Sequence, residues 1–174
     1  LSVVADPDAG APARELLETV ASEADLLAVT SAAAIRALVS LTSRDDVVAA
    51  VAAGQRRGMR CVAVGSATAR QLEELGATQV LVPPVQDSDS MLAMLHDLPP
   101  GLAVLPRGNL AMKGLAEGLD NRGWSVKSEQ VYLTQPTDPP SGVTDALVHG
   151  ALDGVVLRSP SGVRVLRDCL AGRR

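Results

Sequence analysis

Several predicted turns of the sequence carry small or hydroxylic side chains where a strand would pass into a helix. They are Thr30-Ser31, Gly65-Ser66-Ala67-Thr68, Arg107-Gly108-Asn109 and Ser159-Pro160-Ser161-Gly162. A helix N-terminus presents unpaired backbone N–H groups and the positive end of the helix dipole, so it attracts anions. In open α/β sheets such turns gather at one edge. Together they would suit a ligand that carries many carboxylates.

Each of these turns, taken singly, is better explained by helix capping. Ser66 and Ser159 are predicted N-cap residues, and Pro160 suits the first helical position. The segment Gly65-Ser66-Ala67-Thr68 lacks the spaced glycines and the lysine of a phosphate-binding loop. Anion binding is therefore predicted for the set of turns, not for any one of them.

Two larger polar side chains have positions that suit a reactive cleft. Tyr132 ends a predicted strand, where its phenol either donates a proton in a cleft or packs at a domain edge. Arg107 either pairs with a carboxylate or is solvated. Trp124 follows Gly123 at a helix–strand corner, and a structural role is expected there.

Metal and covalent chemistry have no support in the sequence. His96 and His149 show no metal-ligand spacing with Cys, Asp or Glu, and neither cysteine has a histidine nearby. Cys61 and Cys169 are predicted to be buried thiols of a reducing compartment, which favours a cytoplasmic protein. We expect neither a metal nor a cofactor.

Short apolar runs alternate along the chain with segments of helical spacing. The predicted strands are Leu26 to Thr30, Cys61 to Val64, Gln79 to Val82, Leu102 to Leu105, Val126 to Tyr132 and Gly154 to Leu157. Apolar residues in the intervals recur at helical spacing, as in Ile35, Leu38 and Val39. This alternation predicts an α/β fold in which parallel sheets are covered by helices on both faces.

Two proline-containing breaks indicate the domain organisation. The stronger one, Gln135 to Gly142, contains three prolines, and the weaker one is Asp6 to Gly10. The sequence between them holds five predicted strands, enough for a complete small domain, whereas the sequence after them is too short to bury a core alone. Residues 25–38 also align with residues 153–166 at a constant offset of 128, with four identities. We therefore expect one whole domain and a fragment of a related one.

The charge and hydropathy of the chain exclude two classes of partner. Its net charge is −4, and no Lys/Arg stripe with interleaved aromatics is present, so general nucleic-acid binding is not expected. No apolar run approaches the roughly 18 residues that a membrane span requires. A negative chain does not steer an anion from a distance, so any anion site must be local.

Taken in order, these turns resemble the pattern of the uroporphyrinogen-III synthase family. The motifs are Val29-Thr30-Ser31, Val62 to Leu72, Val82-Pro83 after Gly76, Leu105-Pro106-Arg107-Gly108-Asn109, Val131-Tyr132-Leu133-Thr134 and Ser159-Pro160-Ser161-Gly162. Their order and spacing match across essentially the whole chain. The sequence departs from the family pattern at Ala32, often proline there, and at Arg158, usually threonine or an aromatic.

The resemblance implies two similar parallel-sheet, flavodoxin-like three-layer domains joined by a two-stranded connector, with one domain incomplete in this chain. Residues 1–6 and 129–137 would form the connector, and residues 7–128 the complete, inserted domain. Residues 138–174 would be a fragment of the other, discontinuous domain. The family's Gly-x-x-Thr-Ala turn after the Ser-Pro-Ser motif is not found before Arg174.

The resemblance also implies a function. The family's enzyme is a cofactor-free, monomeric lyase of haem, sirohaem and cobalamin biosynthesis. It cyclises hydroxymethylbilane (preuroporphyrinogen) to uroporphyrinogen III, with loss of water and inversion of ring D. Tyr132 matches the family tyrosine that assists departure of the hydroxyl group. The residues that would bind the substrate are Ser31, Ser66, Thr68, Arg107, Gly108, Asn109, Ser159 and Ser161.

Two alternatives stay open at this point. One is a non-catalytic module that binds tetrapyrroles or small anions and is fused to a DNA-binding domain beyond Arg174. A helix-turn-helix further along would favour it, and a second Gly-x-x-Thr-Ala motif would favour the enzyme. The other alternative, a nucleotide-binding α/β domain, is weakened by the missing phosphate fingerprint.

Overall fold

The computed structural model describes residues 2–111, 114–137, 142–156 and 160–171. The chain forms two compact units, one of Val4–Leu133 and one of Leu1–Val3 with Thr134–Arg174. The elements of the first part of the chain are β1 (Ser2–Ala5), α1 (Gly10–Ser22), β2 (Leu26–Val29), α2 (Ala32–Leu41), α3 (Arg44–Arg56), β3 (Arg60–Ala63), α4 (Ser66–Glu74) and α5 (Ser88–Met94). They are followed by β4 (Leu102–Gly108), α6 (Gly114–Asp120), β5 (Ser125–Gln135), α7 (Val143–Val148) and α8 (Pro160–Ala171).

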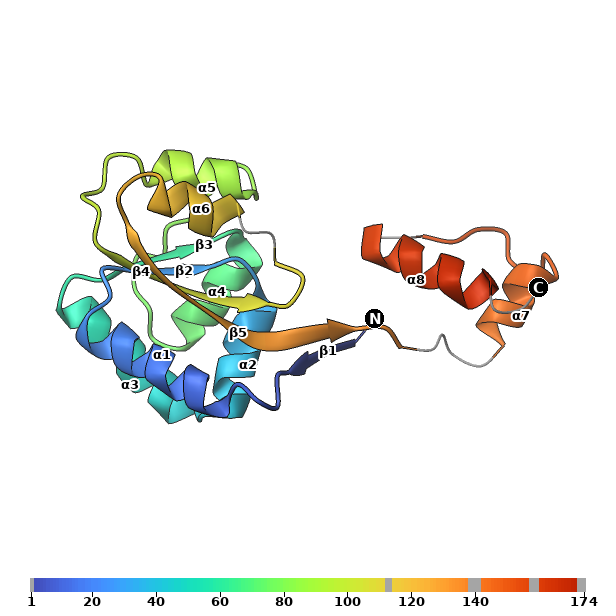
Figure 1. Ribbon diagram of the computed structural model, residues 1–174, viewed down its shortest axis with the longest axis horizontal. Helices are drawn as coiled ribbons and strands as arrows, with labels where there is room; N and C mark the ends of the chain where they lie inside the picture. Colours follow the sequence, from blue (N-terminus) through green and yellow to red (C-terminus); the bar gives the residue numbers. More distant parts are fainter. Residues whose placement is uncertain (1, 112–113, 138–141, 157–159, 172–174) are drawn as a thin grey trace. The chain divides into compact units, whose positions relative to one another are not determined.

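The strands form one five-stranded sheet in the order β1-β5-β4-β2-β3. β2 pairs in parallel with β3 on one side and with β4 on the other, and β4 pairs in parallel with β5. Figure 1 shows that β1, at the edge, runs opposite to β5. The predicted α/β class is therefore confirmed, but the sheet is mixed, because one edge strand departs from the predicted parallel pattern.

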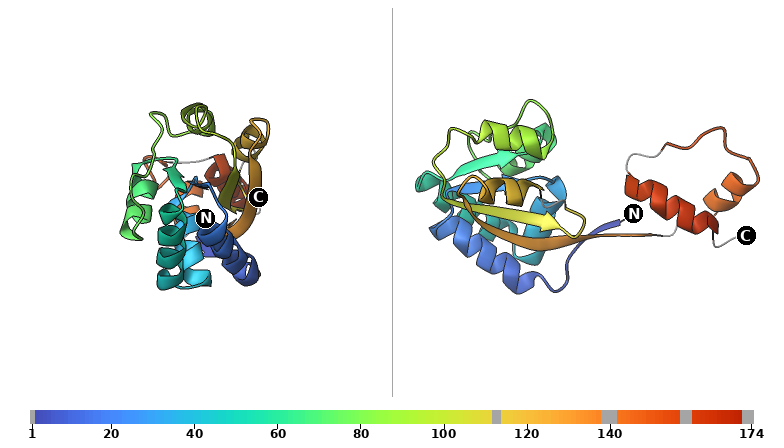
Figure 2. Two further views of the ribbon diagram at one scale, coloured as in Figure 1. Left: turned by 90° about the vertical axis from the view of Figure 1, so that its left-hand side faces the viewer. Right: turned by 45° about the horizontal axis from the view of Figure 1, so that its top comes forward.

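Helices cover both faces of the sheet, as the apolar runs predict. Alternate residues of β2 point to opposite faces, so Leu27 and Val29 join one core cluster while Leu26 and Ala28 join another. The first, which we call the α1–α4 cluster, is completed by helices α1 to α4. The second, the α5–α6 cluster, includes Trp124 and residues of α5 and α6. Figures 1 and 2 show the sheet between these two groups of helices.

The core holds no phenylalanine, and close packing of small residues takes the place of large side chains. Helices α1 and α3 lie against each other, and at Gly54 a β-carbon would stand 2.6 Å from the carbonyl oxygen of Val20. Any larger residue there would push the two helices apart. Gly54 is thus kept despite the cost of about 1 kcal/mol that glycine carries inside a helix.

Two of the predicted strands are absent from the described residues. In the segment Gln79 to Val82 only Leu81 makes a bridge, to Val62, because Gln79 has a positive φ of 53° and prolines follow at positions 83 and 84. The predicted strand from Gly154 has no strand structure over residues 154–156, where Val156 is 89% exposed, and its end at Leu157 lies outside the described residues. A strand needs a neighbour to pair its backbone, and the described residues of the sheet give this segment none.

The unit of Leu1–Val3 and Thr134–Arg174 has little core. Helices α7 and α8 pack on each other, but no apolar side chain among the described residues of this unit is fully buried. Its second copy of the internal repeat includes residues 157–159, which lie outside the described part of the chain. No described helix is both long and apolar enough to span a bilayer. The domain boundaries given by the family resemblance stay a prediction.

Removal of the Arg57 side chain should destabilise the unit of Val4–Leu133. Its guanidinium donates to the carbonyl oxygens of Ala21 at 2.9 Å, Ala24 at 3.2 Å and Val20 at 3.3 Å, at the carboxyl end of α1. We expect Arg57→Ala to lower the free energy of unfolding by about 1–2 kcal/mol, measured by urea denaturation.

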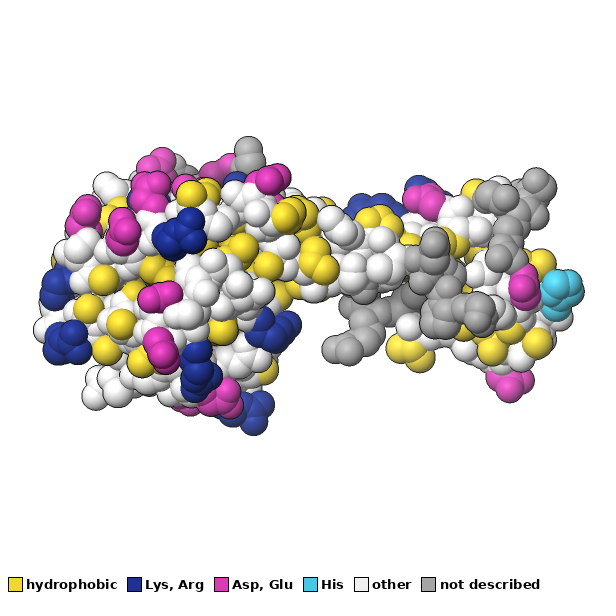
Figure 3. Space-filling view, turned by 90° about the horizontal axis from the view of Figure 1, so that it is seen from below, with side chains coloured by type: hydrophobic (Ala, Val, Ile, Leu, Met, Phe, Trp, Pro, Cys, Tyr) yellow, Lys and Arg dark blue, Asp and Glu magenta, His cyan; other side chains and the backbone are white. Residues whose placement is uncertain are grey.

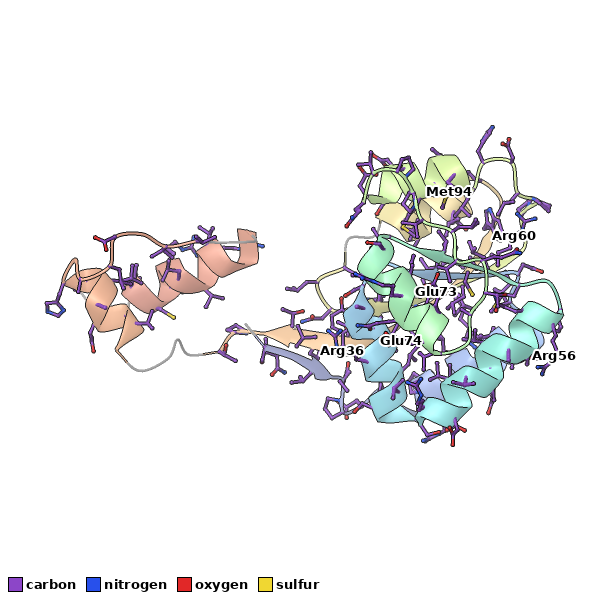
Figure 4. The ribbon with its side chains drawn as sticks, turned by 180° about the vertical axis from the view of Figure 1, so that it is seen from behind. Arg36, Arg56, Arg60, Glu73, Glu74 and Met94 are labelled. Atoms are coloured by element: carbon purple, nitrogen blue, oxygen red, sulfur yellow. The ribbon has the colours of Figure 1, made fainter. Side chains whose placement is uncertain are left out.

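Arg56→Ala is the matched control, since Arg56 at the end of α3 caps no described carbonyl (Figure 4). Its loss should stay within about 0.5 kcal/mol. Equal losses in the two variants would contradict the capping role of Arg57.

Candidate functional site

The parallel pairing brings three of the four predicted turns, those after β2, β3 and β4, to one edge of the sheet, because parallel strands all end at the same side. The backbone N–H of Val64 donates to the carbonyl oxygen of Val29 at 3.0 Å, so β2 and β3 stay paired up to their turns. At the end of β4, the N–H of Asn109 donates to the carbonyl oxygen of Tyr132 at 3.2 Å. The carboxyl ends of β2, β3 and β4 and the middle of β5 thus lie along a common edge.

Ser31 caps helix α2 as its position before the helix suggests. Its backbone is extended, and its hydroxyl oxygen accepts a hydrogen bond from the N–H of Ala33 at 3.1 Å. The hydroxyl is still able to donate its own proton. A half-buried serine at a helix N-terminus can therefore offer a hydrogen bond to an incoming carboxylate while it caps the helix.

The prediction that Ser66 caps the next helix is wrong, because the cap is Gly65. Its backbone is extended (φ −163°, ψ 168°), as is usual for an N-cap residue, and no side chain caps this end of α4. The exposed Ser66 stands at the first helical position, and Thr68, on the first turn, is buried. Gly65 also lies against the side chain of Gln86, whose Oε1 would be 2.7 Å from an added β-carbon.

A cavity of about 310 Å³ opens beside the carboxyl ends of β2 and β4. Strand order reverses at β2, whose neighbours β3 and β4 follow it on opposite sides, and open α/β sheets bind ligands at this kind of switch point. The cavity lies on the face of the α5–α6 cluster, with Ala28, Leu105 and Leu115 in its wall. Among the described residues, its polar lining consists of Thr30, Arg107, Asn109, Glu117 and Ser128.

Arg107 supplies a positive charge at this edge. Its side chain is exposed at the end of β4, and no carboxylate of the described residues forms an ion pair with it. A guanidinium of this kind suits bidentate binding of a carboxylate. Figure 3 shows the opposite side of this unit, that of α1 and α3, where acidic and basic side chains are interspersed. The net charge of the chain is −4, so any attraction of this edge for an anion would have to be local.

Tyr132 lies at the same edge, on the other face of the sheet from the cavity. It is half-buried and packs against the α1–α4 cluster. Its ring covers Gly108, where an added β-carbon would stand 2.4 Å from Cε2 and Cζ. The pairing of β4 with β5 shifts register between Arg107 and Gly108, so Gly108 faces Tyr132. The structure thus brings Tyr132 and Gly108 into direct contact.

Not all of the predicted site residues join this edge. Ser159 lies outside the described residues, and Ser161 belongs to the first turn of α8, in the other unit, with its side chain not described. The remaining candidates, Ser31, Ser66, Thr68, Arg107, Gly108, Asn109 and Tyr132, all belong to the unit of Val4–Leu133.

Sequence reasoning missed three polar side chains near this edge. Ser128 and Glu117 line the cavity, and strand alternation along β5 would have placed Ser128 on the same face as Val126. Arg36 lies between α2 and α4 in Figure 4. The amide nitrogen of Gln71 can donate to the carbonyl oxygen of Ala32 at 3.1 Å. In that orientation the amide oxygen of Gln71 accepts from Arg36 Nη1 at 3.2 Å.

The described residues hold no cluster of three or more His, Cys, Asp or Glu side chains that could bind a metal.

Cys61 is buried in β3, and burial raises the pKa of its thiol to about 11. The thiolate is the nucleophilic form, so Cys61 is inert near neutral pH. Cys169 is also free but only half-buried, in contrast to its predicted burial. Asp25 has a structural role, since its Oδ2 accepts from the N–H of Leu102 at 2.8 Å, at the start of β4.

Comparisons with known proteins point to one family. The family model described as "Uroporphyrinogen-III synthase HemD" matches residues 2–173. The chain is 31% identical over 159 residues to the "Putative uroporphyrinogen-III synthase" of Methanothermobacter thermautotrophicus, a match that spans 88% of this chain and 60% of that protein. The chain therefore spans about 60% of the length of this curated relative.

Solved structures of uroporphyrinogen III synthase from the extremely thermophilic bacterium Thermus thermophilus share the fold. A mutant form superimposes with a TM-score of 0.67 at 23% identity, over 97% of this chain and 64% of that one. The wild type gives a TM-score of 0.61 at 24% identity, over 97% and 63%. At these identities the likeness concerns the fold.

The two thiols should differ in reactivity towards a chromogenic disulfide reagent. At pH 8 about one Cys61 thiol in a thousand would be ionised in the folded protein, so Cys61 in a Cys169→Ser variant should react at least about 100-fold more slowly than Cys169 in a Cys61→Ser variant. Its rate should rise with pH up to about 11 and should reach that of Cys169 in denaturant. Equal rates in the folded protein at pH 8 would show that Cys61 is not shielded.

Proposed function

Because the chain belongs to the uroporphyrinogen-III synthase family, we propose that the protein that carries it cyclises hydroxymethylbilane to uroporphyrinogen III, with loss of water and inversion of ring D. The observation that supports this best is the carboxyl edge of the sheet in the unit of Val4–Leu133. It combines uncapped or hydroxyl-capped helix N-termini, the exposed Arg107 and a tyrosine held by packing.

The substrate has the charge that this edge can bind. Each pyrrole of a uroporphyrinogen precursor carries an acetate and a propionate side chain, so carboxylates are spread along the whole linear molecule. Several weak donors placed along one edge suit such a ligand better than a single strong site. Ser31, the first turn of α4 with Ser66 and Thr68, and Arg107 with Asn109 would each hold a different carboxylate.

The chemistry asks little of the protein beyond position. Loss of the terminal hydroxyl group of the bilane gives an azafulvene, which the last pyrrole attacks through its substituted carbon. The spiro intermediate then fragments and closes again with that ring inverted. The bilane also cyclises by itself, to the isomer without inversion. The protein therefore has to fold the chain of pyrroles and hold it, which is a positional contribution.

Tyr132 is the residue that we assign to the departing hydroxyl group. A phenol can donate a proton to the leaving oxygen, and the Tyr132 ring is held by contact with Gly108 and with the α1–α4 cluster. Departure of the hydroxyl group as water needs a proton donor and no metal ion. On this proposal the protein is a lyase that uses no cofactor.

The finer organisation belongs to the same proposal. The chain would form two similar flavodoxin-like domains joined by a two-stranded connector, with one domain incomplete here. Residues 1–6 and 129–137 would be the connector, residues 7–128 the inserted domain and residues 138–174 a fragment of the other, where Ser159 and Ser161 would add further carboxylate contacts. We propose a cytoplasmic monomer that does not bind nucleic acid.

Isomer analysis tests the proposed function directly. Freshly generated hydroxymethylbilane is incubated with this chain and, in parallel, with a longer protein that contains it, and the cyclised products are separated. We expect type III uroporphyrinogen above the background without protein. Type III product from the longer protein alone would mean that these 174 residues do not suffice. Type I product throughout would exclude the enzyme and leave a module that binds without catalysis.

The Tyr132→Phe variant tests the assignment of the leaving-group step. The change removes the hydroxyl group but keeps the ring that packs on Gly108, so the fold should be retained. We expect kcat for type III product to fall about 100-fold, within the range of general-acid contributions, with KM nearly unchanged. An unaltered melting temperature serves as the control. Wild-type kcat in the variant would remove Tyr132 from the mechanism.

A further inference from the structure

The side chains of β5 alternate between the two faces of the sheet along most of the strand. Ser128 lines the cavity on the α5–α6 side. Lys127 points to the other side, where its Nζ lies 2.7 Å from Glu15 Oε1 and 2.9 Å from Thr19 Oγ1, both on α1. Val131 belongs to the α1–α4 cluster, on the same side of the sheet. Strict alternation would therefore place Tyr132 on the α5–α6 side, beside Ser128.

Tyr132 instead packs against the α1–α4 cluster, on the same side as Val131. The cause is a β-bulge in the pairing with β4. Arg107 pairs with Gln130, and the next residue, Gly108, pairs with Tyr132, so Val131 is an extra residue in β5. A bulge places two consecutive residues opposite one and can re-aim the second side chain. The bulge thus turns the Tyr132 ring over Gly108.

The turned ring has room only because position 108 is glycine. A β-carbon there would stand 2.4 Å from Cε2 and Cζ of Tyr132 and 2.9 Å from its Oη, much closer than non-bonded atoms approach. The backbone on the tyrosine side is tied at both bulge residues. The carbonyl oxygen of Val131 accepts from the N–H of Asp6 at 3.0 Å, and that of Tyr132 accepts from the N–H of Asn109 at 3.2 Å. An added methyl group would therefore displace the ring more readily than the strand.

From this geometry we propose that Gly108 is a positioning residue, which together with the bulge at Val131 sets where the Tyr132 hydroxyl group stands. The inference rests on the proposed function for its catalytic consequence. Its structural part does not depend on the proposed function. It states that the position of the Tyr132 ring, which belongs to the only tyrosine in the chain, depends on the absence of a side chain at position 108. Gly108 acts through Tyr132 and needs no contact with the substrate.

A fluorine label tests the structural part. Because the chain has one tyrosine, biosynthetic incorporation of 3-fluorotyrosine gives a single ¹⁹F resonance for the folded chain. Gly108→Ala should shift this resonance, since the ring leaves its place over the glycine. Gly10→Ala is the matched control, because nothing lies within 4 Å of a β-carbon there, and it should leave the resonance unmoved. An unchanged resonance in Gly108→Ala would overturn the proposal.

A double-mutant comparison tests the catalytic part. If Gly108 positions the hydroxyl group, Gly108→Ala should lower kcat for type III product by up to about 100-fold with little change in KM, the size of effect that a displacement of about 1 Å can have. In the Tyr132→Phe background the same change should lower kcat no further. If Gly108→Ala lowers kcat as much in the Tyr132→Phe background as it does alone, Gly108 does not act through the hydroxyl group, and the proposal is overturned. Full activity of Tyr132→Phe alone would refute the assignment of Tyr132, while the ¹⁹F resonance would still decide the positioning.

A third variant covers the case in which Gly108→Ala does not fold. The clash is with the ring, so Tyr132→Ala should remove it, and the double variant Gly108→Ala/Tyr132→Ala should melt at the temperature of Tyr132→Ala. A double variant as unstable as Gly108→Ala would mean that Gly108 is needed for another reason. That result would also overturn the proposal.

Discussion

Four strands of the sheet run parallel, so every connection between them has to return along a helix to the edge where it started. That condition decides much of the molecule. It requires helices on both faces, and therefore side chains that are apolar on both faces of β2, β3 and β4, as in Leu26-Leu27-Ala28-Val29. It also makes each strand end point at a helix beginning. The turns after β2, β3 and β4 lie at one edge because parallel pairing puts the ends of these strands on the same side.

The hydrogen-bond donors at this edge are mostly uncharged groups. Ser31 caps α2 and keeps a hydroxyl proton to donate, and α4 begins at Gly65 with no side chain in the way. These groups carry at most a partial positive charge, and Arg107 adds a full one at the end of β4. With a net charge of −4, the chain would have to attract a carboxylate through such local groups. A long polyanion would meet several moderate contacts along the edge.

The sequence was informative where one physical rule acts alone. Runs that are apolar on both faces predicted β2, β3 and β4, and the turn chemistry predicted which residues stand at their ends. It failed where tertiary contacts decide. Gln79 takes a positive φ that its residue type does not suggest, so the strand around Leu81 shrinks to a bridge. Gly65, not Ser66, is the N-cap of α4, at a position that lies against the side chain of Gln86.

The candidate site could also be predicted only in part. The turns identified its residues, but the sequence did not show which of them lie on which face of the sheet. Arg107 and Asn109 belong to the cavity under α6, whereas Tyr132 contacts the opposite face. The cavity itself needs Ser128 and Glu117, which no motif marks. Alternation along β5 fails after Val131, the extra residue of the bulge. No residue type in the sequence predicts a bulge there.

The bulge at Val131 has a consequence for how such a sequence can change. Along a regular strand the face that a side chain occupies is a matter of parity, which substitutions leave untouched and single-residue insertions or deletions reverse. Tyr132 lies on the α1–α4 face because the extra residue, Val131, is accommodated in the bulge. Loss of that one residue would restore one-to-one pairing, and the tyrosine would then follow Gln130 directly, still opposite Gly108 and on the same face. The ring would reach the cavity side only if β5 kept its length and lost the bulge. The bulge thus absorbs one residue of chain length without moving the tyrosine, so an alignment of related chains can open a one-residue gap here and still match the tyrosine to the same face.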